Sequence, residues 1–265
     1  MGQAPPESTA SDRSSSHGDR IRLLDAVRGF SVVSMVLFHF YYDLVFFIGI
    51  VPTSAFFTLA VDIWRASISW TFLFIAGAMV TFSKSNLKRA GLYLAVAAAI
   101  YLVTSFIGKD VEISFGIIYC MGACTLIAAL LKMAGFKPDG WGWIAAFLIA
   151  FLLLLGLHRG SIGCFGIEIA RIPRAVYEGG MLSWLGLPGV DFISADYYPL
   201  LPYLFLYLTG WSCALRWQRS GYSHPVWGFS IRPLEFIGRH ALPIYVLHQP
   251  VLLGISQLIS VAIGR

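Results

Sequence analysis

The chain has 265 residues, of which 57% are hydrophobic and only 12% charged, and its mean hydropathy is +0.73. This leaves too little polar surface to coat a soluble globule of this size. The net charge of +5 is spread in short basic groups between apolar runs, which argues against nucleic-acid binding. The composition therefore predicts an all-α, polytopic integral membrane protein that contacts membrane lipid.

About seven transmembrane helices are predicted, after residues 1–19, which are rich in Ser, Pro and charge and which we expect to form a disordered cytoplasmic tail. Within one transmembrane domain at 20–265, the expected helices are 23–47, 56–82, 89–107, 113–132, 141–157, 197–216 and 239–262. With the N-terminus in the cytoplasm, most basic loops lie on the cytoplasmic side, as the positive-inside rule requires.

The long loop at 158–196 is the exception, because it faces outward in this topology and still carries several Arg residues. We expect its segment 181–187 to lie at the interface or to re-enter the membrane. If this segment spans the membrane instead, every later helix changes direction.

Four ionisable residues share one face of the first predicted helix: Asp25, Arg28, His39 and Asp43. Ionisable side chains inside a membrane segment are costly and usually functional. Because Arg28 and His39 are separated by roughly 16 Å along the helix axis, we expect them to serve different parts of one elongated cleft.

The two residues at each end of this face suggest a role for that end. Asp25 is placed to hold Arg28 as an ion pair, and Asp43 to accept a hydrogen bond from one ring nitrogen of His39, which leaves the other nitrogen as a base. The alternative is that Asp25 and Arg28 anchor the helix at the headgroups and that His39 bonds a neighbouring helix as a structural residue. That alternative leaves the common face unexplained.

A basic group, Lys84, Lys88 and Arg89, lies in the cytoplasmic turn after the second helix. Such a group suits the phosphates of a nucleotide-type cofactor, and it suits a topology anchor equally well. On the second helix itself, Asp62 and Arg65 lie one turn apart, and packing against a neighbour is the favoured role of that helix.

Polar residues near the outer ends of the last two helices are candidates for substrate binding. Tyr245 and His248 are three residues apart and so share a face, although a structural hydrogen bond is an equal alternative for His248. Asp196 precedes the sixth helix at the expected mouth of a cavity, where a helix cap is the alternative role. The sequence has no spacing typical of metal ligands, no Gly-rich phosphate loop and no Ser nucleophile elbow, so no metal is expected.

Several motifs together resemble bacterial relatives of the heparan-alpha-glucosaminide N-acetyltransferase catalytic domain. The first helix carries the pattern Arg22-x-x-Asp25-x-x-Arg28-Gly29 followed by Met35-Val36-x-x-His39-x-x-x-Asp43-Leu44. The stretches 72–77 (FLFIAG), 115–122 (FGIIYCMG), 194–200 (SADYYPL) and 236–250 (FIGRHALPIYVLHQP) fit the same group. The likeness covers most of residues 20–262, and the Arg-Gly and His pairing also resembles the wider group of membrane O-acyltransferases that modify surface sugars.

This resemblance implies transfer of an acyl group, acetyl from the small-molecule donor acetyl-CoA, to a sugar or lipid-linked acceptor. His39 matches the position expected for the catalytic histidine, acting as a base on the acceptor or carrying the acetyl group transiently. By a looser match, Arg28 and the Lys84, Lys88, Arg89 group bind CoA. The resemblance also implies a bacterial inner membrane.

Two other classes of function stay open. In a transporter or lipid-handling channel, the same polar face would line a solute path and His39 would relay protons without any need for CoA. A purely structural membrane protein would leave the charges on one face unexplained. The sequence determines neither the acceptor nor the oligomeric state, so a homo-oligomer remains open.

Overall fold

The computed structural model describes residues 21–221, 225–229 and 231–264, so the tail expected at 1–19 lies outside the described residues. The long helices are α1 (Arg22–Phe46), α2 (Leu59–Phe82), α3 (Asn86–Ile107), α4 (Ile117–Met133), α5 (Trp141–Leu153), α6 (Leu200–Arg219) and α8 (Ala241–Ala262). Shorter elements are α7 (Arg232–Arg239), an antiparallel hairpin of β1 (Ser161–Cys164) and β2 (Ile167–Arg171), and the 3-10 turns Thr53–Ala55, Lys109–Val111, Leu157–Arg159, Arg174–Tyr177 and Pro225–Gly228.

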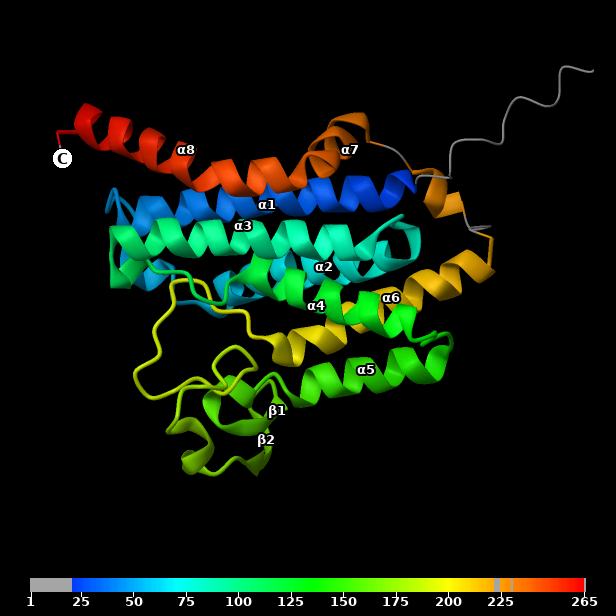
Figure 1. Cartoon of the computed structure of the whole chain (residues 1–265). Helices are drawn as coiled ribbons and strands as arrows, with labels where there is room; N and C mark the ends of the chain where they lie inside the picture. Colours follow the sequence, from blue (N-terminus) through cyan, green and yellow to red (C-terminus); the bar gives the residue numbers. More distant parts are fainter. Residues whose placement is uncertain (1–20, 222–224, 230, 265) are drawn as a thin grey trace, which may run out of the picture.

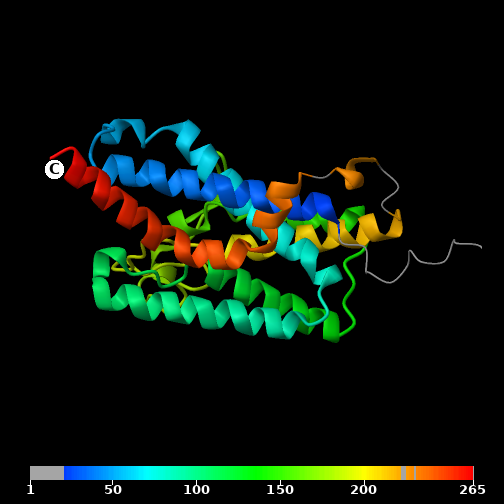
Figure 2. The same cartoon turned by 90° about the horizontal axis from the view of Figure 1, so that it is seen from above.

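The helices form one elongated bundle whose two ends have different character (Figure 1). We call the end where α1 begins the N-side; the α2–α3, α4–α5 and α6–α7 connections also lie there. We call the opposite end the C-side; it holds the hairpin, the long α5–α6 connection and the end of α8. α2 packs against α1, α4 and α6, while α7 and α8 follow one another along α1 (Figures 1 and 2).

Among the residues that the structure describes, five segments are long and apolar enough to cross a membrane: α1, α2, α3, α8 and Trp141–Arg159. α4 is apolar but shorter, with 17 residues. Only 6% of the most apolar window of α3 and 11% of that of α8 is buried inside the protein. Apolar helices with so little protein cover need lipid around them. The expected all-α membrane bundle is confirmed, while the number of seven spans stays a prediction.

Glycine pairs bring two sets of helices into backbone contact. A Cβ added at Gly29 would lie 1.9 Å from the carbonyl oxygen of Leu234 on α7, and one at Gly238 would lie 1.9 Å from that of Asp25 on α1. The α2–α6 contact is equally close at Gly77. Small residues allow such approach between membrane helices, which packing rather than water holds together.

Helix starts differ from the expected ones where a side chain caps the first turn. α2 begins at Leu59 rather than 56, because the Thr58 hydroxyl accepts a hydrogen bond from the backbone N–H of Val61. α3 begins at Asn86 rather than 89, because Ser85 caps it in the same way through the N–H of Lys88. The last expected helix, 239–262, corresponds to α8, which begins at Ala241, and the short helix α7 before it was not predicted.

The C-side loops fold inward, because α4 and α6 begin deeper in the bundle than the ends of α1 and α3 (Figure 1). The loop before α4 pairs with the loop before α6: the N–H of Ala195 donates to the carbonyl of Glu112 at 2.9 Å, and that of Tyr198 to the carbonyl of Phe115 at 2.8 Å. The segment 181–187 forms turns in this region rather than a spanning helix, and α5 before it and α6 after it run antiparallel (Figure 1).

Candidate functional site

Two histidines from opposite ends of the sequence meet in the C-side half of the bundle. The rings of His39 on α1 and His248 on α8 lie edge to face, with centroids 4.6 Å apart. Nδ1 of His39 lies 3.0 Å from the carbonyl oxygen of Met35, and Nδ1 of His248 lies 2.5 Å from that of Tyr245. A carbonyl only accepts, so each Nδ1 carries the hydrogen and each Nε2 is left with a free lone pair.

Asp43, one turn beyond His39, has no exposed surface. Its carboxylate accepts hydrogen bonds from Nε2 of Gln249 at 3.3 Å and from the hydroxyl of Ser256 at 3.1 Å, both on α8. The expected hydrogen bond from His39 to Asp43 is therefore not formed, since the Met35 carbonyl holds the ring instead. Asp43 joins α1 to α8 beside the histidine pair.

The polar partners of Asp43 were missed by the sequence analysis. Gln249 and Ser256 are seven residues apart, which is two helical turns, so they lie on one face of α8. A pair of polar residues at this spacing in an apolar helix indicates a polar contact on that face, and this pattern can be recognised in the sequence. The spacing alone does not identify Asp43 as the partner, because α1 and α8 are separated by most of the chain.

Asp196 closes the C-side of the site from the loop before α6. Its Oδ2 accepts a hydrogen bond at 3.0 Å from the backbone N–H of Ile117, the first residue of α4, so the cap is formed between distant segments. A Cβ on Gly116 would lie 2.7 Å from this oxygen, which only glycine avoids. Burial raises the pKa of the Asp196 carboxyl, and this hydrogen bond and the positive charge of Arg65 lower it in part.

The stability of this cap can be tested at Asp196. Because the pKa of the carboxyl is raised in the folded protein, its contribution to stability falls as the pH rises from the ordinary carboxyl range upward. We expect Asp196→Asn, which keeps an accepting oxygen, to remove this loss. We expect Asp196→Ala to cost about 1 kcal/mol, since the N–H of Ile117 is then without an acceptor.

The measurement is the melting temperature in detergent across pH 5 to 9. At pH 8 the expected order is Asp196→Asn at or above wild type, with Asp196→Ala below both. Equal melting temperatures for the two variants at every pH would show that the cap contributes nothing.

Tyr245 extends the site toward α4. Its ring lies 5.6 Å from that of His248, and it lines a small cavity of about 10 Å³ with Ser114, Gly116 and Tyr119. Gly116, which lines this cavity with Tyr245, also lies against the Asp196 carboxylate. The structure thus gathers five residues singled out in the sequence into one region: His39, Asp43, Asp196, Tyr245 and His248.

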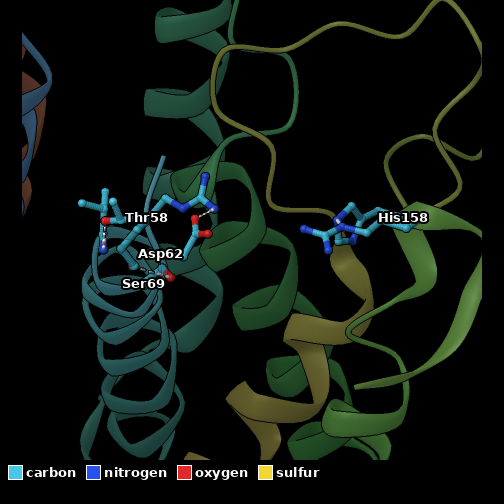
Figure 3. Close-up of polar contacts among 7 residues, drawn as sticks. Thr58, Asp62, Ser69 and His158 are labelled. Atoms are coloured by element: carbon cyan, nitrogen blue, oxygen red, sulfur yellow. Dashed lines mark hydrogen bonds and ion pairs between the residues drawn. The ribbon is translucent and has the colours of Figure 1, made fainter. Parts of the chain in front are cut away.

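A charged pair on α2 lies near this region on the C-side. Nη2 of Arg65 donates to Oδ1 of Asp62 at 2.9 Å, and both side chains are exposed. Figure 3 shows Asp62 and Ser69 on α2, and His158 on the neighbouring segment after α5. The guanidinium of Arg65 is among the groups that lower the pKa of the Asp196 carboxyl in part, and Asp62 balances its charge within the exposed pair.

The remaining predicted residues lie toward the N-side. Nη1 of Arg28 donates to Oδ1 of Asp25 at 3.2 Å, so the expected ion pair is formed. Lys84 and Lys88 are exposed. Arg89 turns inward instead, and its Nη2 donates to the phenol oxygen of Tyr207 at 2.8 Å.

An apolar groove of about 460 Å³ lies in the same half of the bundle, between α1, α2 and α6. Leu24 and Val27 line it, and each directly precedes one member of the Asp25–Arg28 pair in the sequence. Aromatic side chains, including Trp70 on α2, make up much of the opposite wall. The polar N-side residues and the histidine pair thus lie at different positions along the length of the same bundle.

Comparison with protein-family models finds a match over residues 20–250, to the family described as heparan-alpha-glucosaminide N-acetyltransferase, catalytic. Comparisons with curated proteins and with solved structures find no match. The matched range runs from the start of α1 into α8 and includes both His39 and His248. Since it covers most of the chain, this protein belongs to the heparan-alpha-glucosaminide N-acetyltransferase catalytic family and has a membrane acetyltransferase type of function.

Proposed function

We propose that the protein transfers an acetyl group from acetyl-CoA to an amine or hydroxyl of a sugar or lipid-linked acceptor. The observation that carries this proposal is the pair of imidazole rings inside the membrane bundle, each with its Nε2 lone pair free. His39 supplies the reactive nitrogen, either as a base on the acceptor or as a transient carrier of the acetyl group. Asp196 and Tyr245 lie where an acceptor entering from the C-side would contact them.

The donor enters from the N-side in this proposal, and the N-side is the cytoplasmic face of a bacterial inner membrane. The positive-inside rule supports this orientation, because the N-side connections hold Lys84, Lys88, Lys132 and Arg219. Lys84 and Lys88 have no ion-pair partner in the described part of the chain, so they are available for the phosphates of CoA.

Arg28 and Arg89 complete the proposed donor site in different ways. Arg28 lies beside the residues that line the apolar groove, which offers an apolar path for the chain of the donor. Arg89 holds Tyr207 and the carbonyl of Ala76, so it acts by fixing α2, α3 and α6 around the donor.

Acetyl-CoA binding to the purified protein in detergent tests the donor site. We expect Lys84→Ala combined with Lys88→Ala to raise the Kd for acetyl-CoA by about tenfold for each ammonium group that binds a phosphate. The matched control is Lys109→Ala, an exposed lysine just beyond the other end of α3. The 3′-dephospho form of acetyl-CoA shows whether the two lysines bind the 3′-phosphate, because the double variant would then bind both forms more nearly alike.

The outcome decides between two classes of function. Failure of every form, wild type included, to bind or turn over acetyl-CoA would sink the acyltransferase proposal. Transport with His39 as a proton relay would then be the better account of the same polar face.

A further inference from the structure

Nε2 of His248 is a buried acceptor without a donor. Across the described residues, no protein group forms a hydrogen bond with this atom, although the ring centroids of His248 and His39 are only 4.6 Å apart. The Tyr245 carbonyl already occupies Nδ1 of the same ring. A buried polar atom left unpaired is costly, so a site that keeps one free is suited to a ligand that satisfies it.

The next residue along α8 holds a second acceptor of the same kind. Oε1 of Gln249 is also buried and unpaired within the described chain, while Nε2 of the same amide is used by Asp43. Both free atoms accept hydrogen bonds and neither donates. The ligand that fits them therefore carries N–H or O–H groups, as an amino sugar or a polyol does.

Building on the proposed acetyl transfer, we infer that His248 is the base that takes the proton of the acceptor, while His39 carries the acetyl group. A histidine that holds the acetyl group on Nε2 has no lone pair left there to accept a proton. The second imidazole, with its own Nε2 free, lies against the first ring and supplies the missing base.

The chemistry balances over two steps. First, Nε2 of His39 attacks the thioester carbonyl carbon, the carbon–sulfur bond breaks, and the CoA thiolate leaves and takes a proton from water. Next, the oxygen or nitrogen of the acceptor attacks the acetyl carbon and gives its proton to Nε2 of His248. The bond from the acetyl carbon to His39 breaks, its electron pair returns to Nε2, and His248 releases the proton to water.

The groups around His39 support this division of roles between the two histidines. Acetylated His39 carries a positive charge, and the Met35 carbonyl accepts from its Nδ1 while the buried carboxylate of Asp43 lies within electrostatic range. The carboxylate is itself held by Gln249 and Ser256, so it stays in place through both steps.

Two assays on the full-length protein in detergent separate the roles. Exchange of labelled CoA into acetyl-CoA reports the first step alone, and transfer of acetyl to water or to glucosamine reports both steps. The variant His248→Asn keeps an amide N–H for the Tyr245 carbonyl and removes the base. We expect it to lower the transfer rate by about 10²–10⁴-fold, to keep exchange near the wild-type rate, and to accumulate acetylated protein detectable by mass.

The matched control is His240→Asn, because His240 makes the same bond from Nδ1 to a carbonyl, that of Phe236, at the start of α8. It should keep both activities. Equal loss of exchange and transfer in His248→Asn would assign a structural role to His248, and unchanged transfer would remove it from the reaction. Transfer without exchange in the wild type would contradict the carrier role of His39, whereas neither activity in the wild type would fail the proposed function itself.

Discussion

His39→Ala is expected to abolish acetyl transfer, lowering the turnover of acetyl-CoA by about 10²–10⁴-fold. The variant removes the ring whose Nε2 is left free by the hydrogen bond between Nδ1 and Met35. Binding of acetyl-CoA should persist, because the proposed phosphate contacts at Lys84 and Lys88 lie at the other end of the bundle. Turnover is measured by thiol release from acetyl-CoA, and binding by calorimetry on the same preparation.

The control for this prediction is His240→Ala. His240 has the same bond from its Nδ1 to a backbone carbonyl but is exposed at the start of α8, so its replacement should leave turnover unchanged. If His39→Ala and His240→Ala lower turnover to the same extent, the effect is on the fold and His39 has no special place in the chemistry.

Gly77→Ala is expected to prevent stable folding. The added Cβ would lie 1.9 Å from the carbonyl oxygen of Tyr207, and the facing Gly210 is just as close to the carbonyl oxygen of Phe74, at 2.0 Å. Because the obstacles are backbone atoms, no rotamer change relieves the overlap, and α2 and α6 must separate. The expected cost is about 3 kcal/mol or more, seen as aggregation in detergent and a lower melting temperature.

The control Gly254→Ala separates the effect of helix–helix contact on stability from the effect of helix propensity. Gly254 lies inside α8, and its added Cβ would meet nothing within 4 Å. Alanine there should be neutral or stabilise by up to about 1 kcal/mol, through its better helix propensity. A melting temperature for Gly77→Ala equal to that of Gly254→Ala would mean that the two helices do not touch where the structure places them.

The sequence alone was sufficient to predict the helices and the polar face shared by four residues of α1. Apolar runs near 20 residues mark spans because only satisfied backbones cross lipid, and the helical period places Asp25, Arg28, His39 and Asp43 together. In the structure this face is covered by α7 and α8, which lie along α1. The ion pair of Asp25 and Arg28 is local, and a separation of three residues predicts it.

Contacts between segments that are distant in the sequence could not be predicted from the sequence. Asp43 was expected to hold His39, one turn away, but its partners come from α8, and a helical period cannot choose between a local and a distant donor. The late start of α4 has the same origin, because its cap is Asp196, which follows it by 79 residues. The short helix α7 was likewise not predicted, and its close backbone contact with α1 at Gly29 and Gly238 is a contact between distant segments.

The dependence of Asp43 on α8 sets an order of events during synthesis. Its partners Gln249 and Ser256 follow it by 206 and 213 residues. At a synthesis rate of roughly 5–20 residues per second, α1 waits in the membrane for about 10–40 s before those groups exist. A newly made chain therefore carries an unmatched carboxyl until its final helix inserts, and arrest or truncation before α8 leaves that carboxyl without either partner.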